Sequence, residues 1–225
     1  MAALAAAVHL WADATGAASV ALAAKPLPVL ALAAFVWTGR RGALGTLVGV
    51  GLLVSAVADV AIERWFLGGI ALFLLAHVLY VAAFVADERA WRLARALPFA
   101  LYTASMYAFL RPQLGALAVP VGAYVVAIAV MMWRAAARVH PGEAAGRWAL
   151  LGALAFGLSD SLLALHRFHA PLPGASVAIM LTYWAGQLGI ALSATARRRP
   201  SARSPTTAAV PVASDTSAPA STSRR

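Results

Sequence analysis

Apolar segments of about twenty residues recur along most of the chain, and no other feature constrains its fold as strongly. A helix needs about 20 apolar residues to cross the hydrocarbon layer of a bilayer. Such segments are expected at about 19–38, 42–61, 66–86, 93–110, 114–134, 146–165 and 174–196. Because 62% of all residues are hydrophobic and only 12% are charged, the sequence predicts an all-α, polytopic transmembrane helical bundle rather than a soluble domain.

The two ends of the chain differ from these segments. Residues 1–15 are apolar but shorter than the spanning length, so the sequence leaves open whether an additional first helix is truncated or partly interfacial. With it, we predict about eight helices in a transmembrane domain at 1–199. Residues 200–225 are rich in Ser, Thr, Pro and Ala and have no apolar period, which predicts a disordered cytoplasmic tail.

The arginines predict the orientation of the chain. The net charge of +10 could suggest a nucleic-acid partner, but the arginines concentrate in alternate connections, as the positive-inside rule requires. The arginine-rich connections and the tail carry Arg40, Arg41, Arg89, Arg92, Arg95, Arg134, Arg138, Arg147, Arg197, Arg198, Arg199 and Arg203. The intervening connections carry one each: Arg64, Arg111 and Arg167. We therefore predict a multi-pass protein of a bacterial-type plasma membrane, with both termini cytoplasmic and no nucleic-acid partner.

Two aspartates, Asp59 and Asp160, lie inside predicted spanning helices. An aspartate at the centre of a bilayer costs about 2.5–3.5 kcal/mol on insertion scales, so such residues are typically functional. We predict a carboxylate pair for acid–base chemistry, with one member protonated and the other ionised. The alternative is that each aspartate pairs with a basic residue near a helix end and has only a structural role.

His77 and Tyr80 lie at positions i and i+3, on the helical face that also carries Phe73. They are candidates for a proton shuttle or a substrate hydrogen bond. The alternative is polar packing between helices, worth only about 0.6 kcal/mol on average in membranes. The five histidines are scattered without an HxxxH or HExxH pattern, so neither a metal nor another cofactor is expected. The absence of cysteine excludes thiolate chemistry.

Several other polar residues are candidates for binding a substrate. Lys25, the only lysine, precedes Pro26 and is expected at a helix start or break. It could pair with an aspartate, bind an anionic head group, or only extend to the membrane interface. Arg167 could hold a phosphate with its forked donors, or be an ordinary loop residue. Tyr183 and Gln187, at i and i+4, could line a cavity or hydrogen-bond between helices.

A weak internal repeat accompanies the two aspartates. The segment Ser55–Asp59 is similar in form to Phe156–Asp160, four predicted helices later, which suggests a 4+4 duplication. It places Ser55 and Ser159 near the two carboxyls. With the predicted orientation, the ionisable residues would gather in the outer half of the bundle.

Together these motifs resemble the YhhN-like lysoplasmalogenase family of eight-helix membrane proteins, over about residues 5–196. The residues that carry the resemblance are Lys25-Pro26-Leu27, Ser55, Asp59, Phe66, Gly69, Phe73, His77, Tyr80, Ser159-Asp160-Ser161, Arg167-Phe168, Tyr183 and Gln187. The chain departs from the family pattern at its short N-terminus and at Ala58, where the family has glycine.

The resemblance implies hydrolysis of the vinyl ether of a lysoplasmalogen, a membrane lysophospholipid, to a fatty aldehyde and glycerophospho-ethanolamine or -choline. In this reading Asp59 and Asp160 act as acid and base in an order left open, and His77 and Tyr80 tune or relay protons. The implied substrate-binding residues are Lys25, Arg167, Tyr183, Gln187, Ser55 and Ser159. The alternative is a transporter or lipid-binding membrane protein that uses the same polar pocket.

Overall fold

The computed structural model describes residues 1–39 and 42–196, and nearly all of them are helical. The α-helices are α1 (Ala2–Ala14), α2 (Ala18–Ala24), α3 (Leu27–Gly39), α4 (Gly42–Arg64), α5 (Phe66–Asp87), α6 (Leu97–Leu114), α7 (Ala118–Ala137), α8 (Ala144–Ala164) and α9 (Ala175–Thr195). Two 3-10 turns, η1 (Leu93–Arg95) and η2 (Gly115–Leu117), flank α6, and a π-helical turn, η3 (Leu165–His169), extends α8.

Six segments of the described chain are long and apolar enough to cross a membrane. They are Ala18–Gly39, Gly42–Arg64, Phe66–Asp87, Leu93–Ala137, Ala144–His169 and Ala175–Thr195. The fourth contains both α6 and α7, whereas α1 has 13 residues and falls short of the spanning length. The prediction of an all-α, polytopic bundle is confirmed. The number of eight spanning helices and the domain boundary at residue 199 stay predictions, and the expected tail at 200–225 lies outside the described residues.

The chain breaks its first long apolar segment at Lys25, as the sequence predicted. The expected helix over 19–38 is divided into α2 and α3, and Lys25 follows the last residue of α2. Pro26 has no N–H to continue the ladder of backbone hydrogen bonds. The break places the Lys25 side chain toward α4 rather than within a continuous helix, because its ammonium contacts Glu63 there.

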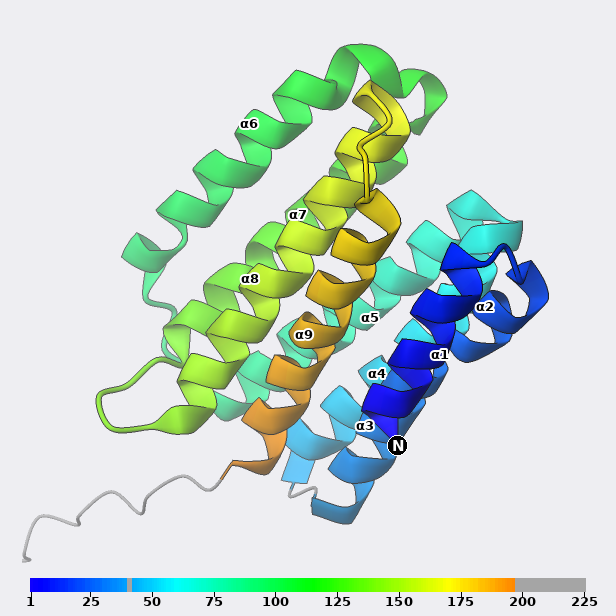
Figure 1. Ribbon diagram of the computed structural model, residues 1–225. Coiled ribbons are helices and arrows are strands. Elements are labelled where there is room, and N and C mark those ends of the chain that lie inside the picture. Colours follow the sequence, from blue (N-terminus) through cyan, green and yellow to red (C-terminus); the bar gives the residue numbers. More distant parts are fainter. Residues whose placement is uncertain (40–41, 197–225) are drawn as a thin grey trace, which may run out of the picture.

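The bundle is built from closely packed helix pairs. Helix α4 packs along α5, and α8 packs along α9, whereas α6 lies at one edge on α7 and η3, opposite α1–α3 (Figure 1). Small residues allow α8 and α9 to approach closely. A Cβ atom on Gly152 would lie 2.6 Å from the backbone nitrogen of Ile190, and one on Gly186 would lie 2.8 Å from that of Phe156.

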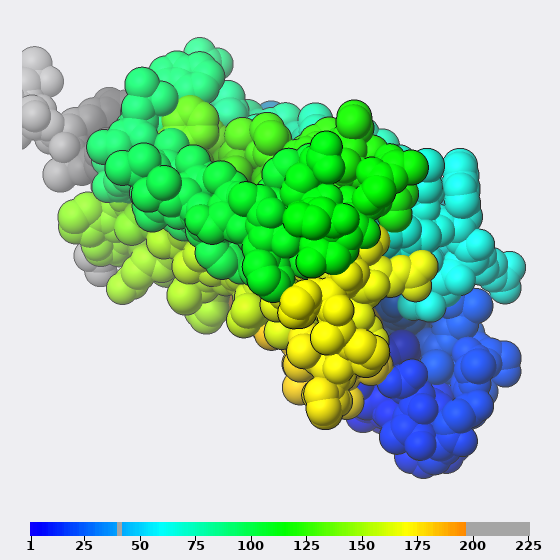
Figure 2. All heavy atoms as spheres, turned by 90° about the horizontal axis from the view of Figure 1, so that it is seen from above, coloured from blue at the N-terminus to red at the C-terminus, as the bar shows by residue number. Residues whose placement is uncertain are grey.

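Every second connection between consecutive long helices lies at the same end of the bundle. Figure 2 looks onto the end that carries the α6–α7 turn (green), the α8–α9 connection (yellow) and the α4–α5 turn (cyan). Asp59 lies five residues before the end of α4, and Asp160 lies four residues before the end of α8. Both aspartates therefore lie toward this end, as expected from their positions in the sequence.

Two arginines at the opposite end are buried rather than solvated. Arg134 and Arg138 are each 1% exposed. Arg138 donates from Nε to Asp87 Oδ2 (2.8 Å) and from Nη1 to Ser193 Oγ (3.2 Å). Arg134 donates to the carbonyl oxygens of Glu88 and Ala90. These two arginines, which the sequence analysis used only to orient the chain, also tie α7 to the end of α5, and Arg138 ties it to α9 as well.

Candidate active site

Asp59 is buried between α4 and α9. Asp59 is only 1% exposed. Tyr183 on α9 donates a hydrogen bond from its hydroxyl to Asp59 Oδ2 over 3.0 Å. The Tyr183 ring is in turn held edge-on against Phe73 and Phe156. The carboxyl is thus positioned by a hydroxyl donor on a rigid aromatic ring.

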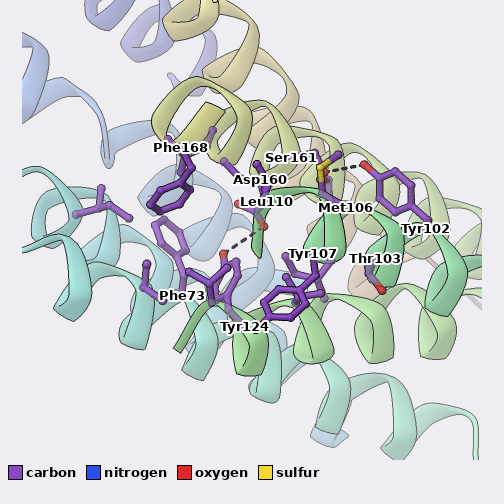
Figure 3. A pocket seen from close by; sticks show the side chains of 18 of the residues that line it. Phe73, Tyr102, Thr103, Met106, Tyr107, Leu110, Tyr124, Asp160, Ser161 and Phe168 are labelled. Atoms are coloured by element: carbon purple, nitrogen blue, oxygen red, sulfur yellow. Dashed lines mark hydrogen bonds between the residues drawn. The ribbon is translucent and has the colours of Figure 1, made fainter. Parts of the chain in front are cut away.

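Asp160 occupies a similar position on α8. Tyr124 on α7 donates a hydrogen bond to Asp160 Oδ2 over 3.2 Å (Figure 3). The same oxygen lies 3.8 Å from His77 Nε2, which is longer than a hydrogen bond. The Asp160 side chain is 15% exposed, so it is more accessible than Asp59. Both aspartates therefore receive their hydrogen bonds from tyrosine hydroxyls on neighbouring helices.

His77 is completely buried on α5. Its Nδ1 lies 2.7 Å from the carbonyl oxygen of Phe73, and because a carbonyl only accepts, Nδ1 is assigned the proton. Nε2 has no hydrogen-bond partner among the described residues. The Asp160 carboxyl lies 3.8 Å from Nε2, which makes His77 a candidate acceptor for a proton held there.

Tyr80 lies at the centre of a second buried network. Its hydroxyl donates to Gln187 Oε1 over 2.8 Å and lies 3.3 Å from Ser55 Oγ. All three residues are fully buried, and Gln187 Nε2 has no hydrogen-bond partner within the described chain. The network joins α4, α5 and α9. The structure thus brings Ser55, Tyr80 and Gln187 together, one helical turn from Asp59 on α4 and from Tyr183 on α9.

A polar cavity opens beside both aspartates. It has an empty volume of about 610 Å³, open solvent at its mouth included. Its polar lining residues are Lys25, Asp59, Glu63, Ser159, Asp160, Arg167 and Tyr183. The structure therefore gathers most of the sequence-predicted site around one space, whereas His77, Tyr80, Ser55 and Gln187 lie outside its lining.

The cationic side chains of the polar cavity have specific neighbours. Lys25 Nζ lies 2.5 Å from Glu63 Oε1, so its ion-pair partner is this glutamate and not an aspartate. The Arg167 guanidinium lies over the ring of Phe66, 4.5 Å from its centroid. Ser159 donates a hydrogen bond to the carbonyl oxygen of Ile179 on α9, which fits the role of a helix–helix contact at the cavity wall.

An apolar cavity adjoins the polar one. It has an empty volume of about 800 Å³, open solvent included, and is lined mainly by α5, α6, α7 and α8 (Figure 3). Five residues line both cavities: Ile62, Phe66, Phe73, Asp160 and Leu163. Asp160 is the ionisable member of this set, so its carboxyl lies where the two spaces meet.

Sequence reasoning missed two members of the site, Tyr124 and Glu63. Tyr124 carries the one hydroxyl between Leu114 and Met132 of an otherwise apolar helix, and that isolation is the signal that could have found it. Glu63 lies in the last turn of α4, and its pairing with Lys25 could not be found from spacing, because the two residues are 38 positions apart.

The arrangement suits proton transfer within a low-dielectric interior. Two carboxyls, one at the junction of the cavities and one in the polar cavity, can donate and accept protons in alternation. Among residues 1–39 and 42–196, no three His, Cys, Asp or Glu side chains gather as ligands of a metal ion would. The cations of the polar cavity can in addition bind an anionic group.

Comparison with known proteins identifies the family of the chain. The model of the YhhN family matches residues 20–194. The chain is 37% identical to the lysoplasmalogenase TMEM86A of Bos taurus over 205 residues, 85% of each chain. It is 39% identical to the human lysoplasmalogenase TMEM86B over 175 residues, 76% of this chain and 73% of the relative. It is also 30% identical to a lysoplasmalogenase of Mycobacterium bovis over 149 residues, 61% of this chain and 56% of the relative.

No solved structure matches the chain. The family match spans every helix that lines the two cavities, from the break at Lys25 to α9. The protein therefore belongs to the YhhN family.

Proposed function

We propose that this membrane protein is a lysoplasmalogenase, which hydrolyses the vinyl ether bond of a lysoplasmalogen to a fatty aldehyde and glycerophospho-ethanolamine or -choline. One observation carries the proposal: the carboxyls of Asp59 and Asp160, each hydrogen-bonded by a tyrosine, line one polar cavity that adjoins an apolar cavity. A lysophospholipid has a matching polar and apolar part. Relatives that match most of this chain are named lysoplasmalogenases.

The first stage of the reaction needs an acid and a base. A carboxylic acid protonates the second carbon of the alkenyl chain, and the electron pair of the double bond forms the new C–H bond. The resulting oxocarbenium ion is stabilised by the neighbouring carboxylate. Water then adds to the first carbon and gives up a proton to that carboxylate, which leaves a hemiacetal.

The second stage restores both carboxyls. The group that donated the first proton now removes the hydroxyl proton of the hemiacetal, and the C–O bond to glycerol breaks as the aldehyde C=O forms. The other carboxyl returns its proton to the departing glycerol oxygen. The sum is one vinyl ether and one water converted to one aldehyde and one alcohol. Asp59 and Asp160 can fill these roles without a covalent intermediate.

The buried residues His77 and Tyr80 act as positioning residues in this proposal. His77 lies 3.8 Å from Asp160 and can adjust or relay its proton. Tyr80, held by Ser55 and Gln187, fixes α4, α5 and α9 relative to one another. This fixation matters because a displacement of about 1 Å at a catalytic group can cost about 100-fold in rate.

The cations at the mouth of the polar cavity bind the phosphate of the head group. Lys25 and Arg167 both line this cavity, and the guanidinium of arginine matches phosphate geometry with two parallel donors. Glu63 pairs with Lys25, so the site offers an anion as well, suited to the ammonium of an ethanolamine or choline group.

We also propose the membrane orientation that the arginines indicate. The end of the bundle that carries the polar cavity would face outward, and both termini would be cytoplasmic, in a bacterial-type plasma membrane. The arginine-rich connections then lie on the cytoplasmic side.

The test is aldehyde release from lysoplasmenylcholine and lysoplasmenylethanolamine by protein purified in detergent. We expect turnover by wild type and at least a 100-fold loss in both Asp59→Asn and Asp160→Asn. Asp13→Asn is the matched control, because Asp13 is an exposed carboxyl that binds Ser176 outside both cavities.

Two results would contradict the proposal. One is full activity in either cavity variant. The other is a monodisperse wild-type protein that releases no aldehyde but moves lysophospholipid across the membrane of proteoliposomes. The second result would favour the transporter alternative, since transport breaks no bond.

A further inference from the structure

The apolar cavity is a partly open, mainly apolar space between helices of the bundle. Its walls come from α5, α6, α7 and α8 (Figure 3), and its lining includes Phe73, Met106, Leu110, Val121 and Ile128. At one side, the hydroxyl of Tyr102 on α6 and Ser161 Oγ on α8 lie 2.6 Å apart. Helix α6 packs mainly on α7 and on the short turns η1, η2 and η3, so it forms an outer wall of the cavity.

The junction with the polar cavity determines what kind of ligand could occupy both. A molecule that extends through the two spaces has a polar part beside Lys25 and Arg167 and an apolar part between α6 and α8. Its point of transition lies beside the carboxyl of Asp160, the ionisable residue common to both linings.

We propose that the apolar cavity binds the alkenyl chain of the lysolipid while the polar cavity binds its phosphate head group. This assignment rests on the proposed function, because a lysoplasmalogen has a single chain, joined to the polar part by the vinyl ether itself. One apolar cavity is therefore sufficient, and the scissile bond lies at the junction, beside Asp160.

The far end of the cavity can be located from the helices. On α7, Ile128 lies one turn beyond Tyr124, and on α8, Gly157 lies one turn before Asp160. Because α7 and α8 are consecutive and run in opposite directions (Figure 1), both residues lie on the same side of the Tyr124–Asp160 pair. That side is remote from the α8–α9 connection, and it receives the later carbons of the chain.

This orientation assigns the two carboxyls. The carbon to be protonated lies on the chain side of the vinyl ether, and the carbon that water attacks lies on the head-group side. Asp160 lines both cavities and donates the proton to the second chain carbon. Asp59 lines the polar cavity and receives the proton of the attacking water.

Hydrogen bonding around Asp160 agrees with a proton donor. His77 Nδ1 donates to Phe73, which leaves Nε2 as an acceptor facing Asp160 Oδ2. A carboxylic acid can supply the missing donor after a small approach, whereas a carboxylate cannot. Both aspartates accept a hydrogen bond from a tyrosine hydroxyl and line the polar cavity. The acceptor nitrogen of His77, 3.8 Å from Asp160 Oδ2, is therefore the feature that distinguishes Asp160 from Asp59.

The first test compares chain lengths. Ile128→Phe shortens the cavity and Ile128→Ala lengthens it, whereas Val126→Phe, on the 62% exposed outer face of the same helix, is the matched control. The measured quantity is the ratio of kcat/KM for a long-chain and a short-chain lysoplasmenylcholine within each variant. Partial unfolding cancels in this ratio, because both substrates meet the same folded fraction.

We expect Ile128→Phe to lower the long-to-short ratio at least fivefold and Ile128→Ala to raise it. Val126→Phe should keep the wild-type ratio. If neither Ile128 variant changes the ratio more than Val126→Phe does, the chain does not occupy this cavity and the inference is wrong.

The second test does not depend on turnover. The probe is a saturated alkyl-ether lysophosphocholine, which has no vinyl ether, with a photoreactive diazirine at its last chain carbon. We expect cross-links in the wall at 103–128 and near Gly157. Cross-links confined to the surface hollow between α3 and α4, which is lined by Leu30, Leu53 and Val57, would overturn the inference. Cross-links in the cavity without aldehyde release from any lysoplasmalogen would keep the chain site and refute the hydrolase.

A third measurement tests the assignment of the carboxyls. At pH 7 formate is ionised, so it can replace a lost carboxylate but not a lost proton donor. We expect formate to raise the activity of Asp59→Ala at least tenfold and to leave the activity of Asp160→Ala unchanged. The opposite pattern would reverse the two roles.

Discussion

Tyr183 on α9 donates a hydrogen bond to Asp59 on α4 over 3.0 Å, and it thereby connects residues 124 positions apart in the chain. The second aspartate has a corresponding partner, because Tyr124 on α7 donates to Asp160 on α8. Each carboxyl of the proposed active site is thus positioned by a phenol from a different helix. The tyrosines orient the carboxyls without neutralising them by an ion pair.

The Tyr183 hydroxyl should therefore matter for the rate. In Tyr183→Phe the ring keeps its edge contacts with Phe73 and Phe156, but Asp59 loses its donor. A hydrogen bond to a charged group contributes about 1.5–3 kcal/mol, so we expect kcat to fall about 10- to 100-fold. Steady-state kinetics of aldehyde release measure this. The control is Thr182→Val, because Thr182 bonds only within α9.

A kcat of Tyr183→Phe equal to that of wild type would show that the hydroxyl does not position Asp59. The double variant Tyr183→Phe/Asp59→Asn provides a second check. If its loss of kcat, expressed as a free energy, equals the sum of the two single losses, the hydroxyl does not act through Asp59, because the effects of residues in contact are not additive.

Arg167 should act on binding rather than on the chemical step. Its guanidinium lies over Phe66 at the mouth of the polar cavity. Because Arg167 is exposed, we expect Arg167→Gln to raise KM about three- to tenfold with little change in kcat. Arg167→Lys should recover only part of this, because lysine cannot form two parallel bonds to phosphate. Arg111→Gln, an exposed arginine in the last turn of α6, is the control.

A change in kcat at constant KM would contradict this role for Arg167. So would an equal rise in KM for Arg111→Gln, which would point to a general effect of surface charge on the encounter with anionic lipid.

The α8–α9 contact should be intolerant of side chains. A Cβ atom on Gly186 would lie 2.8 Å from the backbone nitrogen of Phe156, so Gly186→Ala forces two helix backbones apart. Overpacking of this kind costs about 1–3 kcal/mol, and thermal unfolding in detergent should show a lower Tm. At Gly49 a Cβ atom would lie 3.4 Å from the ring of Trp37, an ordinary contact, so Gly49→Ala should unfold close to wild type. Equal Tm values for wild type and Gly186→Ala would contradict this description of the interface.

Glu88 should make the stability depend on pH at the opposite end of the bundle. It follows α5, outside the spanning segment, and its carboxylate accepts hydrogen bonds from Ala90 N–H (2.9 Å) and His140 Nε2 (2.7 Å). Partial burial acts to raise the pKa of Glu88, but these bonds and the charges of His140 and Arg92 outweigh it and lower that pKa below its ordinary value of 4.5.

A lowered pKa stabilises the folded state above the pKa of the unfolded chain, and the contribution is lost as the pH falls through the lowered value. We therefore expect Glu88→Gln to have a lower Tm than wild type at pH 7, and this difference to shrink as the pH falls below about 4.5. Glu143→Gln, a carboxyl in the neighbouring α7–α8 connection, is the control. A difference that grows toward acid would have the wrong sign.

Much of the fold could be predicted because a membrane imposes simple local rules. The lengths of the apolar segments and the break at Lys25-Pro26 depend only on residues close in the chain, and both were predicted from the sequence. The aspartates could be selected for the same reason, since a carboxyl within a spanning helix is costly wherever it packs. Tyr183 and Gln187 could be selected as candidates from their i, i+4 spacing on one spanning helix.

The partners of these residues could not be predicted. Lys25 was considered as a partner of an aspartate, yet it pairs with Glu63 on another helix. Tyr124 was passed over in an apolar segment, although it holds Asp160. Arg134 and Arg138 were used only to orient the chain, but both are buried and hydrogen-bonded between helices.

The sequence by itself predicted the class of the protein, most of its apolar helical segments and the two candidate carboxyls, because each depends on the local cost of placing residues in hydrocarbon. Only the tertiary structure decided which hydroxyl meets which carboxyl, and that a polar and an apolar cavity meet at Asp160. Cavities and interhelical hydrogen bonds are made by residues from several helices. Their positions depend on how the helices pack side by side, which no spacing along one helix records.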